Sequence, residues 1–144
     1  MSLSGSNSNV AEEDSDNNTN TDNQNQMLIH HNDSIDIGVP AFFYFKLNTN
    51  ELIDESQLND LDKIAELAKD PNLLVTITGA ADKATGNKKI NRGLSRERAR
   101  YIAEELIKRG IDKSQMKVCS LGGINRYSPN EANRNTCVIV QRLK

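Results

Sequence analysis

The sequence is poor in the residues that build metal centres and redox sites. It contains two cysteines, Cys119 and Cys137, with no CxxC pair, and its two histidines are the adjacent His30 and His31. No further histidine or cysteine lies near that pair, so we interpret it as two solvated side chains. The cysteines fall in apolar strand patterns typical of buried thiols, and a disulfide would require neighbouring strands and an oxidising compartment. We therefore predict no metal and no cofactor.

Long apolar runs are also missing. No stretch of about 18 apolar residues occurs, so the sequence predicts no transmembrane helix. The N-terminus lacks the basic residues and the apolar core of a secretory signal.

Basic residues are absent from the first part of the chain. Residues 1–37 contain seven Asp or Glu and no Lys or Arg, whereas residues 38–144 contain thirteen acidic and eighteen basic residues, a net charge of +5. The polar composition of residues 1–33 cannot bury enough surface to offset ordering, so we expect a disordered acidic linker there. The mildly cationic remainder suits an anionic polymer, but its charge falls short of a nucleic-acid-binding footprint.

Hydrophobic periodicity predicts one domain over residues 34–144. Its elements follow the order strand, helix, strand, helix, strand, strand, which indicates an α+β sandwich of βαβαββ order with two helices on one face of a mixed β-sheet. A weak further strand is suggested by the alternation over residues 35–39, and the aromatic run at 42–47 is typical of a central strand. The expected strands are 42–47, 73–78, 116–121 and 137–140, and the expected helices are 54–70 and 88–109.

The chemistry concentrates in residues 78–99, where a strand runs into a loop and then a helix. Asp82 lies just beyond the strand, and Asn91 and Arg98 are two turns apart on the helix, so they share a face at a spacing of roughly 10 Å. A carboxylate facing an amide and a guanidinium makes a pocket suited to a zwitterionic ligand. On the same helix, Ile90 and Leu94 are expected on the apolar side, and Gly93 is interpreted as a point of close approach to a neighbour.

These residues also resemble a known family signature. Asp82 followed by Asn91-x-x-Leu94-Ser95-x-x-Arg98-Ala99 is similar to the G-H-T-D and N-x-x-L-S-x-x-R-A motifs of the OmpA-like peptidoglycan-binding domain. Ala80 and Ala81 replace the usual His and Thr. The segment Asn133-Arg134 resembles the family's N-R-R ending, with Asn135 in place of the second arginine. The resemblance covers residues 41–142.

The resemblance implies a non-catalytic module that binds peptidoglycan through the meso-diaminopimelate of its stem peptide. It further implies a periplasmic domain that anchors an outer-membrane or envelope protein to the cell wall, with the domain itself outside the membrane and an upstream region anchored in it. Asp82 would accept hydrogen bonds from the ligand's ammonium group, and Arg98 would hold its carboxylate. The site residues implied by the family are Asn48, Asp82, Asn91, Leu94, Arg98 and Arg134.

Three other interpretations compete with this one. Asp82 and Arg98 could pair only to brace the loop against the helix. An enzyme lacks support, because residues 34–144 contain no histidine to serve Ser95 and Asp82 has no evident second carboxylate. A nucleic-acid-binding α+β domain would use the Arg-rich second helix, but the glutamates among its arginines indicate a solvated face. Its arginines are Arg92, Arg96, Arg98 and Arg100.

Overall fold

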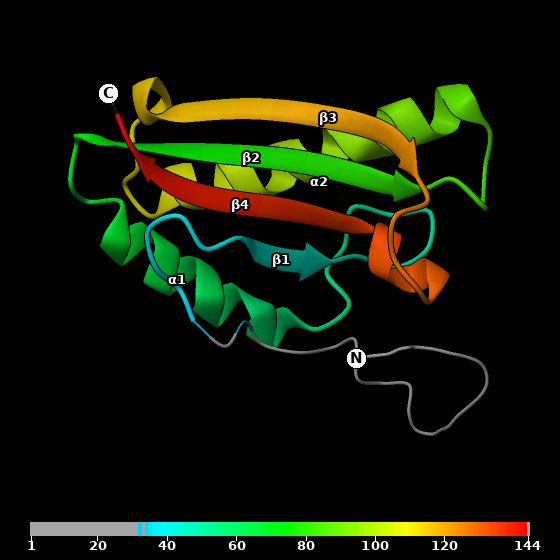
Figure 1. Cartoon of the computed structure of the whole chain (residues 1–144), viewed down its shortest axis with the longest axis horizontal. Coiled ribbons are helices and arrows are strands. Elements are labelled where there is room, and N and C mark those ends of the chain that lie inside the picture. The colour runs from blue at the N-terminus through cyan, green and yellow to red at the C-terminus, as the bar shows by residue number, and fades with distance from the viewer. Residues whose placement is uncertain (1–31, 33, 144) are drawn as a thin grey trace.

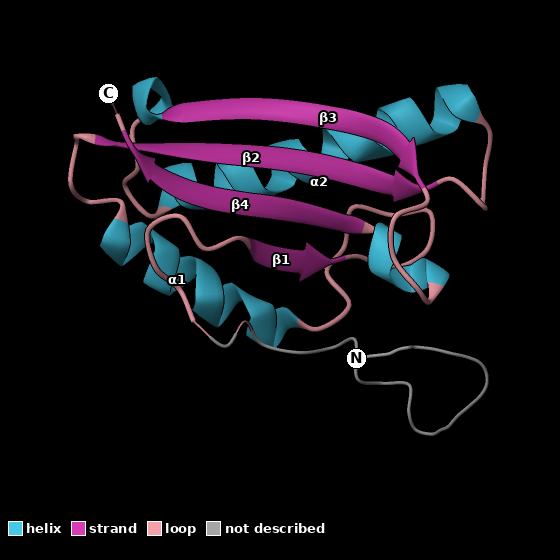
Figure 2. Cartoon of the chain, in the orientation of Figure 1, coloured by secondary structure: helices cyan, strands magenta, loops and turns pink. Residues whose placement is uncertain are grey.

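The computed structural model describes residue 32 and residues 34–143, which form a four-stranded sheet with two α-helices (Figure 1). The predicted linker, apart from Asn32, lies outside the described residues, as does the histidine pair. Figure 2 shows the alternation of strands and helices that confirms the predicted α+β fold and βαβαββ order. The elements are β1 (Ala41–Tyr44), α1 (Leu58–Leu67), β2 (Leu73–Asp82), α2 (Lys88–Lys108), β3 (Met116–Ile124) and β4 (Asn135–Arg142), with short 3-10 turns at Glu55–Gln57, Lys113–Gln115 and Asn130–Asn133.

The sheet has the strand order β1-β4-β2-β3. β2 runs parallel to β3 and antiparallel to β4, and β4 is antiparallel to β1. The C-terminal ends of β2 and β3 therefore meet the N-terminal end of β4 at one end of the sheet. Residues near Asp82, Ile124 and Asn135 are brought together there, although they are far apart in the sequence.

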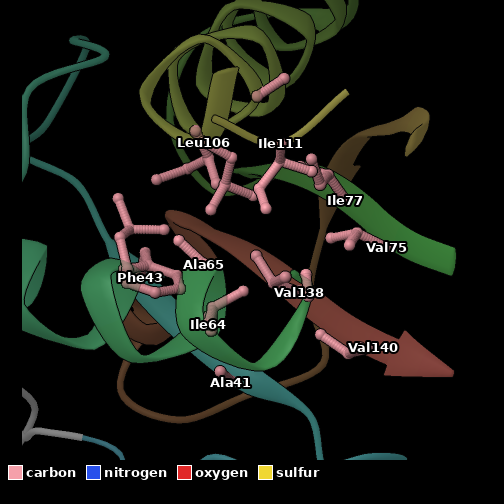
Figure 3. Packing of buried hydrophobic residues seen from close by; sticks show 14 of the residues in the cluster. Ala41, Phe43, Ile64, Ala65, Val75, Ile77, Leu106, Ile111, Val138 and Val140 are labelled. Carbon is pink, nitrogen blue, oxygen red and sulfur yellow. The ribbon is translucent and has the colours of Figure 1, made fainter. Parts of the chain in front are cut away.

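Both helices pack on the same face of the sheet. From Leu73 to Gly79 every second residue of β2 is buried against them, including Val75 and Ile77. Phe43 of β1 and Val138 of β4 join the same core. Figure 3 shows Ile64 of α1 and Leu106 of α2 directed into the same apolar cluster. The period-two burial of the strands and the apolar faces of the helices thus meet in one core.

The first strand differs from its prediction in position and length. β1 lies at the edge of the sheet instead of its centre, and residues 34–40 form no strand. The apolar run suggested a central strand because both faces of β1 carry apolar side chains. On the outer face, Phe42 stacks on Tyr44, and its ring meets the ring of Tyr127 edge-on with a centroid distance of 6.0 Å. The strand ends before residue 47 because the chain turns at Asn48, which has a positive φ of 58°.

Two side-chain amides cover the free edge of β1. Phe42 donates its N–H to Oδ1 of Asn32 and accepts from Nδ2 of the same amide, at 2.8 and 3.1 Å. Gln57 pairs with the backbone of Tyr44 in the same way, at 2.8 and 3.3 Å. Asn32 is held in turn by the buried carboxylate of Asp60. The donors and acceptors that an edge strand normally leaves open are therefore occupied.

The buried face of α2 differs from the predicted apolar side. Ile90 is 49% exposed and Leu94 is half-buried, whereas Asn91, Ser95 and Arg98 are buried. The reason is the close approach of β2, where a Cβ at Gly79 would overlap the Ser95 carbonyl oxygen. Only small or hydrogen-bonded side chains fit this contact, so the N-terminal half of α2 turns a polar face inward.

The interpretation of Gly93 was wrong. A Cβ built at Gly93 would have no neighbour within 4 Å, so this glycine does not mark a close approach. The close approach is made by Gly79 of β2 instead.

The cysteines are free and only half-buried. Cys119 pairs with Thr78 across β2 and β3, and Cys137 pairs with the same Thr78 across β2 and β4. The two cysteines are therefore two strand spacings apart, roughly 9.5 Å between Cα atoms, which exceeds the reach of a disulfide. The condition of neighbouring strands is not met.

Candidate functional site

Asp82 ends β2 and is almost completely buried, with 2% of its surface exposed. The strand extends beyond its predicted end because Ala81 and Asp82 pair with Gly123 and Ile124 after a shift in register. One carboxylate oxygen, Oδ1, accepts the N–H of Ala84 at 2.9 Å and fixes the turn that follows. The other oxygen, Oδ2, points to Arg134.

Arg134 precedes β4 and its side chain is 15% exposed. Its Nη2 lies 3.5 Å from Oδ2 of Asp82, within ion-pair distance. Oδ2 of Asp82 and Nε of Arg134 are both buried and have no hydrogen-bond partner among the described residues. An acceptor of negative charge and a donor of positive charge thus lie side by side with unused hydrogen-bonding capacity, which is costly unless a ligand uses it.

Arg98 is buried, with 1% of its surface exposed. Its Nε donates to the carbonyl of Thr49 at 2.8 Å, its Nη1 to Ala80 at 3.0 Å and its Nη2 to Lys46 at 3.3 Å. The guanidinium carbon also lies 5.5 Å from the centre of the Phe45 ring. Arg98 therefore ties the turn after β1 to the end of β2, using three of its five N–H groups.

Arg98 does not form the brace considered from the sequence. Asp82 has its ion pair with Arg134, and no ion pair between Asp82 and Arg98 occurs among the described residues. The loop that Arg98 secures is the turn over residues 46–49, and it does so through backbone carbonyls.

The site carries an excess of positive charge. Burial, and then the charge of Arg134, lower the pKa of Arg98 to about 10, while the carboxylate of Asp82 opposes this shift. Arg98 is still protonated at neutral pH, so two guanidinium groups share one carboxylate in a largely buried place. An added anion would offset the desolvation of these cations. The one carboxylate can pair with a cationic group and the two guanidinium groups with an anionic group. Because the cations are in excess, the site favours the anionic group.

The other predicted residues are distributed unevenly around this cluster. Asn91 is buried, and its amide reaches the loop after β2 and the end of β3. Asn48 is exposed at the tip of the turn that Arg98 holds. Leu94 is half-buried on α2 and does not belong to the apolar core.

Three residues near the site have structural roles that the sequence did not indicate. Ser95 accepts the N–H of Gly122 at 3.0 Å and so joins α2 to the end of β3. Asn133 accepts from the N–H groups of Arg126 and Tyr127 and shapes the loop before β4. Asn135 donates to the Ala132 carbonyl at 2.7 Å. Their positions in the motifs were the only available signal, since their partners are backbone groups in other elements.

The arginines of α2 do not form a common surface. Arg98 is buried, and Arg100 pairs with Glu97 at 3.1 Å. No observation favours the nucleic-acid alternative. Within residues 34–143, neither α-helix is long and apolar enough to cross a bilayer.

Comparison with known sequences gives one family and one curated relative. Residues 44–136 match the model of the OmpA family. Over 92 residues the chain is 33% identical to outer membrane protein 40 of Porphyromonas gingivalis, which covers 63% of this chain and 24% of that protein. The chain thus spans about a quarter of the length of that relative.

Solved structures share the fold. The peptidoglycan-associated lipoprotein of Burkholderia pseudomallei matches with a TM-score of 0.61 and 25% identity, covering 69% of this chain and 89% of the other. The OmpA-like domain of FopA1 from Francisella tularensis matches with a TM-score of 0.61 and 18% identity, covering 73% of each chain. The periplasmic domain of Helicobacter pylori MotB also has a TM-score of 0.61, at 17% identity, covering 77% of this chain and 80% of the other.

Proposed function

This chain belongs to the OmpA family, and from that membership we propose that its domain over residues 34–144 binds peptidoglycan non-covalently and without catalysis. The ligand is the diaminopimelate of the stem peptide. The domain works in the periplasm and holds an outer-membrane or envelope protein, whose upstream region is membrane-anchored, to the cell wall. Two relatives support the proposal by their names, a peptidoglycan-associated lipoprotein and an outer membrane protein.

The observation that carries the proposal is the pair of unused atoms at Asp82 and Arg134. Oδ2 of Asp82 lacks a donor, and Nε of Arg134 lacks an acceptor. The far end of diaminopimelate carries an ammonium and a carboxylate on the same carbon, so it supplies a donor for the first atom and an acceptor for the second. The ammonium binds Oδ2 of Asp82, and the carboxylate binds Nε of Arg134 and the free N–H groups of Arg98.

Arg134 controls access to this site. Oδ2 of Asp82 is covered while Arg134 lies 3.5 Å from it. The ligand therefore reaches the carboxylate when the partly exposed Arg134 side chain turns outward, and the ligand's carboxylate then holds Arg134 in the new position. The ion pair between Asp82 and Arg134 is thereby replaced by two ion pairs with the ligand, one from Asp82 to its ammonium and one from Arg134 to its carboxylate.

Single-site binding is expected to be weak. Charge-assisted hydrogen bonds contribute about 1.5–3 kcal/mol each, and association removes much of the sum of three or four of them. The expected dissociation constant lies in the range of roughly micromolar to millimolar. Many identical sites along a wall polymer compensate, because tethered copies bind by avidity.

Asp82→Asn is expected to weaken binding to purified sacculi by about tenfold or more, since the amide keeps the shape but loses the charge that attracts the ammonium. Asp70→Asn is the matched control, because Asp70 accepts the N–H of Asn72 in the same kind of turn but is exposed at the other end of β2. Co-sedimentation measures binding, and circular dichroism checks folding. A folded Asp82→Asn variant that pellets like the Asp70→Asn control would contradict the role of Asp82.

The ligand preference gives a second test. Stem peptides with lysine at the third position are expected to bind at least tenfold more weakly than diaminopimelate peptides, because lysine brings the ammonium without a carboxylate for Arg134 and Arg98. Amidating the side-chain carboxylate of diaminopimelate should have the same effect. Calorimetric titration with peptides that differ only at this residue measures it. Equal affinities for the two peptides would assign the arginines to another anion.

A further inference from the structure

A hollow of about 550 Å³ opens at the same end of the sheet as Asp82, and Asp82, Arg98 and Arg134 do not line it. Its wall comes from the loop after β2, the first turns of α2 and the end of β3. Lys83, the residue directly after Asp82, contributes to it, and so do Lys88 and Arg92 of α2 and Gly123 of β3. The hollow also includes Asn91, which the family signature groups with Asp82.

The hollow is cationic. Its wall contains Lys83, Lys88 and Arg92 and no carboxylate, and these three side chains form no ion pair with any described residue. The positive end of the α2 dipole adds to them, and the first turn of α2 contains no acidic residue. The first turn of a helix normally contains Asp or Glu, and lysines there are electrostatically unfavourable. Such locally unfavourable choices are expected at functional sites.

Asn91 is the second, independent observation. It is 4% exposed and lines the hollow, yet its amide makes no hydrogen bond with any described residue. Two glycines leave room for this amide: a Cβ at Gly86 would lie 2.9 Å from Oδ1, and a Cβ at Gly123 would lie 2.9 Å from Nδ2. An amide that opens into the hollow with an unused N–H₂ group, next to three unpaired cations, is suited to an anionic oxygen.

We propose that this hollow binds a second carboxylate of the stem peptide, on a residue adjacent to diaminopimelate. The proposal rests on the proposed function, since the peptide must first bind at Asp82. The hollow is adjacent, because Lys83 directly follows Asp82. The residues next to diaminopimelate are attached to the end of it that points away from Asp82, so their carboxylates extend beyond the Asp82 site. Lys83, Lys88 and Arg92 attract the carboxylate, and the amide of Asn91 donates to it.

The stem peptide offers two carboxylates of this kind. One is the α-carboxylate of the γ-linked glutamate before diaminopimelate, and the other is the terminal carboxylate of the alanine after it. Both present the same chemistry to the hollow. Tetrapeptides amidated at one or the other position distinguish them.

The test is calorimetric titration of the tetrapeptide into the parent protein and into the double variant Lys88→Gln/Arg92→Gln. The double variant is expected to bind about tenfold more weakly. Amidation of the carboxylate that occupies the hollow should weaken binding to the parent by a similar factor and should leave the double variant unaffected. Lys89→Gln, which removes the same charge from the same helical turn outside the hollow, should stay within about twofold of the parent.

The outcomes separate this inference from the proposed function. If Asp82→Asn weakens binding but the double variant binds like the parent, the hollow is not a subsite and the proposed function stands. If the parent does not bind the tetrapeptide, both are overturned. If neither amidation changes binding while inorganic phosphate binds the parent and not the double variant, the hollow is a phosphate site and the carboxylate assignment is overturned. If Lys89→Gln loses as much affinity for the tetrapeptide as the double variant, the loss reflects the net charge of the helix start and the proposed subsite is overturned.

Discussion

Replacing Arg98 with lysine is expected to lower the free energy of unfolding by about 3–5 kcal/mol. The guanidinium donates to the carbonyls of Lys46, Thr49 and Ala80 from a buried position. An ammonium group is a single point on a flexible stem and cannot reach three carbonyls set around a planar fork. At least two buried acceptors lose their charged donor, and the turn after β1 loses its connection to β2.

Urea denaturation measures the loss, and Arg96→Lys provides the matched control. Arg96 lies on the same helix, is exposed and has no ion pair with the described residues, so its replacement should change stability by less than about 0.5 kcal/mol. Sacculus binding by Arg98→Lys should also fall, measured at a temperature where the variant is folded. A lysine variant as stable as the control would show that the three carbonyl contacts contribute little.

Gly79→Ala should be as damaging, with a loss of about 3 kcal/mol or more. The added Cβ would overlap the carbonyl oxygen of Ser95 and would lie 2.8 Å from the backbone nitrogen of Ala99. Both atoms belong to the backbone of α2, so no side-chain rotation relieves the contact. The helix must move away from β2, which separates Arg98 from the turn after β1.

Gly93→Ala is the opposite case in the same region. A Cβ there meets nothing within 4 Å, and alanine favours a helix interior by roughly 0.8–1 kcal/mol over glycine. The two variants add the same methyl group, and thermal or urea unfolding should show a large loss for one and a gain for the other. If Gly79→Ala unfolds like the parent, the close approach of β2 to α2 does not limit the residue at position 79.

Local signals were sufficient for the element order and the location of the site. Alternating residues marked β2, hydrophobic periodicity marked α2, and the motif around Asp82 marked the end of the sheet where both meet. These features depend on residues close in sequence. The family signature added Arg134, which local patterns could not connect to Asp82 across more than 50 residues.

The contacts that depend on tertiary packing could not be predicted in the same way. The inward polar face of α2 follows from the contact between Gly79 and Ser95, and the three acceptors of Arg98 lie in segments 18 to 52 residues away. A guanidinium in the sequence does not reveal whether it faces a ligand or a carbonyl. The lysines at the start of α2 were a usable signal, because they oppose the helix dipole, but only the fold shows the buried amide beside them.

The amides of Asn32 and Gln57 have a consequence for copies of this domain that are held close together. Crowded neighbours with an open strand edge join their sheets through backbone hydrogen bonds and polymerise. Here each amide imitates one residue of a missing strand, so β1 presents completed pairs to an approaching copy. The sheet therefore cannot be extended by a fifth strand at β1 unless both amides are displaced, and high local concentration on this side does not lead to fibrous association.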